Sequence, residues 1–300
     1  MPRYAALVLL SIGLCACRPA EEGHVRAIIG AVLIDGAGGP PRSNSVVVVA
    51  GGRIRAAGSH ADVPIPADAD KVDGAGNYLV PLLVDVCDST DPPGLLHPDS
   101  PADAHAQVAV LAARKITAIH IGTLRPPVAQ AVFEAARDAH IPVTGHVSTQ
   151  AEARFLVDKG ASSLVGMIRD TENLDPLLVS RLRDLRIVVA PSLANAGAGF
   201  EIARHNTRRL FQSGVSLAVA SEGGDPYRET ELMVEAGVPP LDVIVAATRN
   251  GAIALHQLED RGTIAADRRA DLLLVSANPA EDIKNLRRVA LRMVAGEWSR

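Results

Sequence analysis

The chain has 300 residues, of which 48% are hydrophobic and only 3% aromatic, and its formal net charge is −4. This length allows one large domain, or a large and a small one, around a core of Ala, Val, Leu and Ile. The acidic balance, the scarcity of aromatic rings and the lack of a basic stripe argue against nucleic acid as a partner.

The first residues have the pattern of an export signal. Arg3 precedes an apolar run over residues 4–14 that is too short to span a bilayer. Leu14-Cys15-Ala16-Cys17 resembles a bacterial lipobox, in which the last Cys becomes the lipidated first residue. An ordinary cleaved signal with a chance Cys is the alternative. We expect a signal peptide over residues 1–16, lipidation of Cys17, and a cell-envelope protein anchored to a bacterial membrane, facing the periplasm or the exterior.

Residues 25–80 contain short β-branched runs separated by turn clusters. Residues 27–34 and 45–50 predict strands, and Gly51-Gly52 predicts a hairpin turn between the second of these and the next strand. This region therefore predicts a small antiparallel unit. Strand character returns near the end of the chain, in residues 271–275 and 289–294.

From residue 82 onward, apolar, strand-like runs alternate with amphipathic helical stretches. The predicted strands are residues 83–86, 116–121, 141–145, 163–167, 187–190 and 216–220. Helices are predicted between them, for example over residues 128–139 and 151–159. Such alternation predicts an α/β fold with a parallel barrel or an open parallel sheet.

Several segments together resemble the amidohydrolase superfamily, in particular its imidazolonepropionase-like and prolidase-like branch. Asp73-Gly74-Ala75-Gly76 with residues 80–85 resembles the family's D-x-x-G…P-G-L-I-D entry to the barrel, and residues 247–252 and 270–272 resemble its closing signature. The resemblance implies an incomplete TIM-like (β/α) barrel over residues 81–264. It also implies a small discontinuous β-sandwich domain, made from residues 17–80 and 265–300.

The resemblance implies a site with one or two divalent metals at the carboxyl ends of the barrel strands. The family's ligands are an H-x-H pair after the first strand, a Lys on the fourth, a His on the fifth, a His on the sixth and an Asp on the eighth. In this sequence Cys87 and Ser89 replace the H-x-H pair, and His146 keeps the fifth-strand position. Gly166 stands at the sixth-strand His, Glu222 stands at the Asp, and no Lys can be placed.

The spacing of the strands predicts a shortened barrel. Residues 115–119 resemble the family's second strand, and the fifth strand begins near residue 141. This interval is shorter than one βα unit, which needs about 25 to 30 residues. We therefore predict that the third and fourth units are absent and that the barrel is open at this seam, unless the chain or a partner closes it.

Two interpretations of this site stay open. In the first, Cys87, His120, His146 and Glu222 form a rebuilt zinc site in which Glu222 is the catalytic acid or base. In the second, which we favour, the site has decayed and its metal is lost, because the loss of most ligand positions forfeits the affinity that ligand number provides.

The expected function is that of an amidohydrolase-like envelope lipoprotein, with metal-dependent hydrolysis of amide or cyclic-amide C–N bonds as its ancestral chemistry. The alternative is a non-catalytic binding or scaffold lipoprotein that uses the barrel mouth as a pocket. The partners expected are a small-molecule or peptide-like substrate, the membrane through the lipid anchor, and a second copy of the chain.

Overall fold

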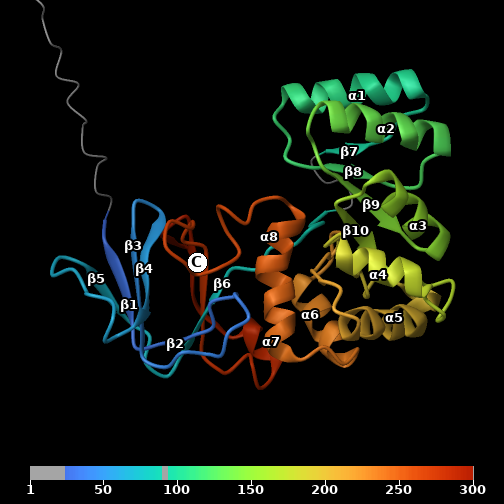
Figure 1. Cartoon of the computed structure of the whole chain (residues 1–300). Helices are drawn as coiled ribbons and strands as arrows, with labels where there is room; N and C mark the ends of the chain where they lie inside the picture. The colour runs from blue at the N-terminus through green and yellow to red at the C-terminus, as the bar shows by residue number, and fades with distance from the viewer. Residues whose placement is uncertain (1–23, 90–93, 300) are drawn as a thin grey trace, which may run out of the picture.

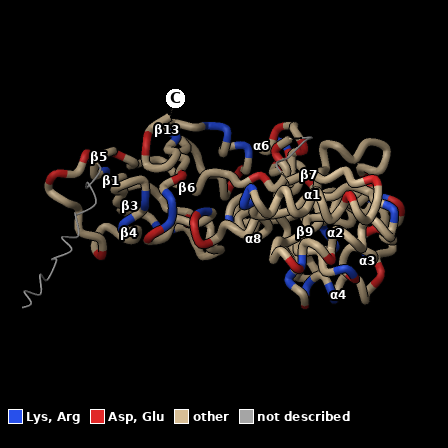
Figure 2. Tube along the Cα trace, turned by 90° about the horizontal axis from the view of Figure 1, so that it is seen from above, with Lys and Arg blue, Asp and Glu red and all other residues tan. Residues whose placement is uncertain are grey.

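The computed structural model describes residues 24–89 and 94–299 (Figure 1). The predicted signal peptide and Cys17 lie outside the described residues. Within the described part of the chain, no helix is long and apolar enough to cross a membrane. Basic and acidic residues are interspersed along the whole trace (Figure 2), in keeping with the absence of a basic stripe in the sequence.

The N-terminal residues form a four-stranded sheet. Its order is β4 (Arg53–Ser59), β3 (Ser45–Ala50), β1 (Arg26–Ile29) and β5 (Asp70–Asp73). Strands β3 and β4 form the predicted hairpin, and Gly51 and Gly52 both have positive φ angles, of 59° and 75°. Two-residue hairpin turns need such angles, which glycine adopts without a steric penalty.

A second sheet combines strands from both ends of the chain. Its order is β14 (Glu297–Ser299), β13 (Val289–Val294), β12 (Leu272–Val275), β6 (Tyr78–Pro81) and β2 (Val32–Leu33). Leu272 and Leu274 of β12 share a buried cluster with Ile28 and Ile54 of the first sheet. The alternate residues Leu273 and Val275 belong to the main core. Strand β12 is therefore buried on both faces and joins the paired sheets to the rest of the fold.

The third sheet is parallel and forms most of the barrel wall. Its order is β11 (Val188–Ala190), β10 (Ser163–Gly166), β9 (Val143–Val147), β8 (Ile119–Ile121) and β7 (Leu95–Leu96). Parallel bridges continue the wall from Val189 to Leu217 and from Val219 to Asp85. The first and last barrel strands, residues 83–86 and 216–220, are thus neighbours in space.

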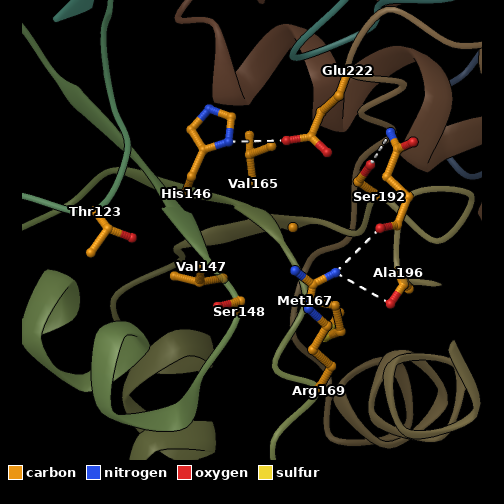
Figure 3. Close-up of a pocket in the computed structure, with 12 residues that line it drawn as sticks. Thr123, His146, Val147, Ser148, Val165, Met167, Arg169, Ser192, Ala196 and Glu222 are labelled. Atoms are coloured by element: carbon orange, nitrogen blue, oxygen red, sulfur yellow. Dashed lines mark hydrogen bonds and ion pairs between the residues drawn. The ribbon is translucent and has the colours of Figure 1, made fainter. Parts of the chain in front are cut away.

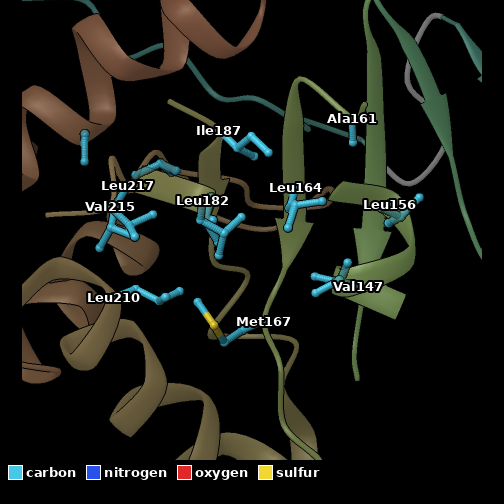
Figure 4. Close-up of a cluster of buried hydrophobic side chains, with 14 of the residues drawn as sticks. Val147, Leu156, Ala161, Leu164, Met167, Leu182, Ile187, Leu210, Val215 and Leu217 are labelled. Atoms are coloured by element: carbon cyan, nitrogen blue, oxygen red, sulfur yellow. The ribbon is translucent and has the colours of Figure 1, made fainter. Parts of the chain in front are cut away.

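Helices cover the outside of this wall. They are α1 (Pro101–Ala113), α2 (Pro126–Asp138), α3 (Gln150–Lys159), α4 (Pro176–Asp184), α5 (Phe200–Gln212), α6 (Pro226–Glu235), α7 (Pro240–Val245) and α8 (Gly251–Ala254), with short turns η1 (Gly197–Gly199), η2 (Ala246–Asn250) and η3 (Ile283–Arg287). Their apolar faces interlock with outward-facing strand residues, as Leu156 and Leu182 do around Leu164 (Figure 4). The large core lies between sheet and helices, which leaves the inward faces of the strands to form the site.

The barrel is incomplete, as predicted, but the seam lies elsewhere. Strands β8 and β9 pair directly, with Ile119 opposite Val143 and Ile121 opposite Gly145, so the chain itself closes the seam at this place. Strand β8 takes the place beside the fifth strand that the fourth strand has in a complete barrel. Among the described residues, no ladder joins residues 83–86 to β7 or β8. Spacing alone could not place the opening, because it does not show which strands pair.

Candidate functional site

The residues that stand at the family's metal-ligand positions lie together at one mouth of the barrel. Cys87, His146 and Glu222 line a single cavity there, although they come from three different barrel strands or strand ends. A neighbouring cavity, of about 190 Å³, also borders His146 and Glu222. This placement follows from the fold, because the carboxyl ends of parallel barrel strands meet at the same end of the barrel.

His146 and Glu222 form the polar centre of the mouth (Figure 3). Nδ1 of His146 lies 3.0 Å from Oε1 of Glu222, and each side chain is about one quarter exposed. The hydrogen bond from His146 lowers the pKa of Glu222, and contacts with Ser192 and Asn195 act in the same direction. An ionised carboxylate on Nδ1 favours the proton on that nitrogen and leaves Nε2 as an acceptor. Nε2 is buried and has no partner in the described part of the chain.

Cys87 and His120 lie nearby but contribute differently. Cys87 is buried, and its thiol donates to the carbonyl oxygen of Ser89 at 3.2 Å. Burial, with the Glu222 carboxylate, raises the pKa of Cys87 to about 12, so the thiol is protonated at neutral pH. The His120 ring centre lies 6.4 Å from that of His146, and burial lowers the pKa of His120 to about 4. Both groups are therefore neutral at neutral pH.

The donor set at the mouth does not fit the metal centre that the family implies. A metal at Cys87 would have to displace the thiol proton, which burial holds by raising the pKa of Cys87 to about 12. Gly166 has a φ of +86°, and a Cβ there would lie 2.5 Å from the carbonyl oxygen of Val147, so this backbone cannot carry the family's His. Within residues 24–89 and 94–299, no three His, Cys, Asp or Glu side chains are grouped to hold a metal ion. The rebuilt zinc site therefore gains no support here.

Arg169 lines the smaller mouth cavity and was not singled out in the sequence. Its Nη1 donates to the carbonyl oxygens of Asn195 and Ala196, at 3.2 and 3.3 Å. Figure 3 shows Arg169 across the cavity from the His146–Glu222 pair. Among the described residues it forms no ion pair, so the guanidinium keeps donors for a ligand. The residue escaped notice because a lone Arg in a loop is normally a solvated surface group.

Glu229 is a second residue that the sequence did not reveal. It lies in α6 and is fully buried, and its carboxylate oxygens accept hydrogen bonds from the N–H groups of Leu193 and Ala194, both at 2.8 Å. These bonds hold the loop after β11, which brings Ser192 and Asn195 to the cavity. Burial raises the pKa of Glu229 to about 7 despite the two backbone donors.

Glu229 should make stability depend on pH. Its pKa is about 7 in the folded protein against an ordinary 4.5, so between these values the folded state binds a proton that the unfolded state has released. Folding stability should therefore fall as pH rises from about 4.5 to about 7. Urea unfolding across this range should show the fall, and Glu229→Gln should flatten it. Glu235→Gln, at an exposed position of the same helix, is the control; equal slopes in the two variants would contradict the assignment.

Comparisons with known proteins place this geometry in a family. The sequence model of the amidohydrolase family matches residues 115–299. No curated protein matches the sequence. Solved structures share the fold. Molinate hydrolase is 15% identical over 93% of this chain and 95% of that chain, with a TM-score of 0.79. A Xaa-Pro dipeptidase with bound methionine in the active site is 16% identical over 92% of this chain and 100% of that chain, with a TM-score of 0.79.

The ochratoxinase of A. niger is similar to the same extent, with 17% identity over 93% of this chain and 96% of that chain and a TM-score of 0.79. At these identities the solved structures show a common fold and no common activity. The family match covers more than half of the chain and includes β8 to β11, His146 and Glu222. The chain therefore belongs to the amidohydrolase family.

Proposed function

We propose that this protein is an envelope lipoprotein that binds a small polar ligand at the barrel mouth and no longer performs the metal-dependent amide hydrolysis of its ancestors. The backbone at Gly166 carries this proposal, because a metal-binding side chain there would collide with Val147. The mouth nevertheless keeps a cavity of about 190 Å³ with polar walls. The pocket is therefore retained, whereas the metal ligands are not.

The charges of the mouth indicate which ligands fit. Arg169 supplies donors for a carboxylate, and Glu222 with His146 offers acceptors on the opposite side. A small molecule with a carboxylate at one end and a hydrogen-bond donor at the other would match both. An amino acid or an N-acylated amino acid has this arrangement. The methionine in the active site of the structurally similar Xaa-Pro dipeptidase supports the same class.

The ligand class can be tested at Arg169. N-acetylmethionine and its amide differ only in the carboxylate, and isothermal titration calorimetry can compare their affinities for the mature protein. Loss of charge-assisted hydrogen bonds costs about 1.5 to 3 kcal/mol, so Arg169→Gln should weaken binding of the acid by about 10- to 100-fold. Arg183→Gln, on the surface of α4, should leave the affinity unchanged. Equal binding of acid and amide, or no effect of Arg169→Gln, would contradict this assignment.

The loss of metal chemistry predicts the composition of the purified protein. Mature protein prepared without chelators should contain much less than one zinc, manganese or iron per chain by plasma mass spectrometry. Added zinc should not raise its melting temperature, because a ligand that binds only the folded state would do so. One zinc per chain that disappears in His146→Ala would overturn the proposal and restore the rebuilt metal site.

The anchor is tested at Cys17, which directly follows the small residue Ala16. Cys17→Ser should move the protein from the membrane fraction to the soluble fraction, because the lipid would no longer be attached. Immunoblots of fractionated cells expressing each form measure the change, and Cys15→Ser is the matched control that should remain membrane-bound. Membrane association of Cys17→Ser would show that the lipid anchor is absent.

A further inference from the structure

A separate cavity of about 380 Å³ opens in the wall of the barrel. It lies between the first barrel strand, residues 83–86, and residues 116–118, which lead into β8. Leu255, Gln257 and Arg261, which follow α8, complete its lining. It shares no lining residue with the two cavities of the mouth. The cavity occupies the side of the barrel where the described strands form no ladder, so strands of a complete barrel would fill this space.

The walls of this cavity combine polar and apolar surface, and the polar surface is the larger of the two. The apolar part comes from Leu83, Val84, Val86, Ile116, Ala118 and Leu255. Asp85, Asp88 and Arg261 also line the cavity, so it carries both signs of charge. Oδ1 of Asp85 accepts from the N–H groups of Cys87 and Ser221, whereas its Oδ2 is buried and has no partner among the described residues.

Three buried polar atoms of the lining residues have no partner in the described part of the chain, and Oδ2 of Asp85 is one of them. His120 is only 3% exposed, and its Nδ1 makes no hydrogen bond within the described residues. Nε of Arg261 is likewise buried and unpaired in that part of the chain. A buried polar group without a partner costs about 1 to 3 kcal/mol, and nearly all such groups in folded proteins are paired. A molecule in the cavity that pairs with His120 and Arg261 would recover this cost.

We propose that the cavity is a second ligand site, which takes a small neutral molecule with an amide-like group. The carbonyl oxygen of such a group accepts from Arg261. When Nδ1 of His120 carries no proton, it accepts from the N–H of the ligand. When Nδ1 carries the proton, it donates to the oxygen of the ligand. A charged ligand is disfavoured because Asp85 and Asp88 repel an anion and Arg261 repels a cation. The apolar part of the ligand packs against Val84, Ile116 and Leu255.

Benzamide, benzoate and benzylamine test the proposal, because they have similar shapes and differ in charge. Their binding to the mature protein is measured by chemical-shift changes in NMR titrations. Benzamide should bind at least about 5-fold more tightly than either charged probe. His120→Leu should weaken benzamide about 5- to 10-fold, the effect of about 1 kcal/mol for a lost hydrogen bond. Ala118→Leu should weaken it further by filling the cavity.

Arg169→Gln, which alters only the mouth, is the matched control and should leave benzamide binding unchanged. Arg261→Leu provides a second variant at the lip of the cavity should Ala118→Leu fail to fold, and it should also weaken benzamide. Three outcomes would overturn the proposal: no binding of benzamide at millimolar concentration, binding that Arg169→Gln reduces and His120→Leu does not, and a dimer in sedimentation that buries this side of the barrel and excludes the probe.

Discussion

The contact on which the site depends is the link between the first and last barrel strands. Oδ1 of Asp85 accepts hydrogen bonds from the N–H groups of Cys87 and Ser221, each at 3.0 Å, and the N–H of Glu222 donates to the carbonyl oxygen of Cys87 at 2.6 Å. These bonds join segments more than 130 residues apart. A carboxylate that accepts from backbone donors forms strong, directional bonds. Without this link the wall would be open on two sides and Glu222 would not face His146.

The backbone at two positions explains why the mouth is a pocket and not a metal centre. Gly166 has a left-handed conformation with Val147 so close that only hydrogen fits in place of a side chain. Glu222 also has a positive φ, of 47°, which costs a non-glycine residue about 1 to 2 kcal/mol. The bonds of Glu222 to Cys87 and His146 offset this cost. The strand end at Gly166 has therefore lost its metal ligand. The strand end at Glu222 holds a carboxylate in place for the hydrogen bond to His146.

Local patterns predicted the helices and strands, because these depend on residues close together in sequence. The resemblance to the family predicted the pair His146–Glu222, because the order of the barrel strands in the family is known. The glycine pair at residues 51 and 52 is an example, since its turn follows from backbone freedom alone. The position of the seam could not be predicted, because the pairing of β8 with β9 is a contact between chain segments that spacing does not specify. Arg169 and Glu229 escaped for a similar reason: each acts through bonds to a loop that is distant in sequence, Arg169 to Asn195 and Glu229 to Leu193.

The shortened barrel also accounts for the size of the mouth. A barrel with fewer strands has a smaller diameter, so its interior holds smaller side chains. The barrel-strand residues of one buried cluster are all small: Val86, Cys87, Val165, Val188, Ala190, Ala218 and Ala220. The low aromatic content of the chain is therefore consistent with the narrow interior, which has little room for large rings. Two cavities border His146 and Glu222, of about 190 and 400 Å³, and only the smaller one, which Arg169 lines, is below the range of about 300 to 1,000 Å³ that drug-sized ligands occupy. The part of the mouth between Arg169 and the His146–Glu222 pair therefore takes a ligand of few atoms, which one cation and one carboxylate can orient.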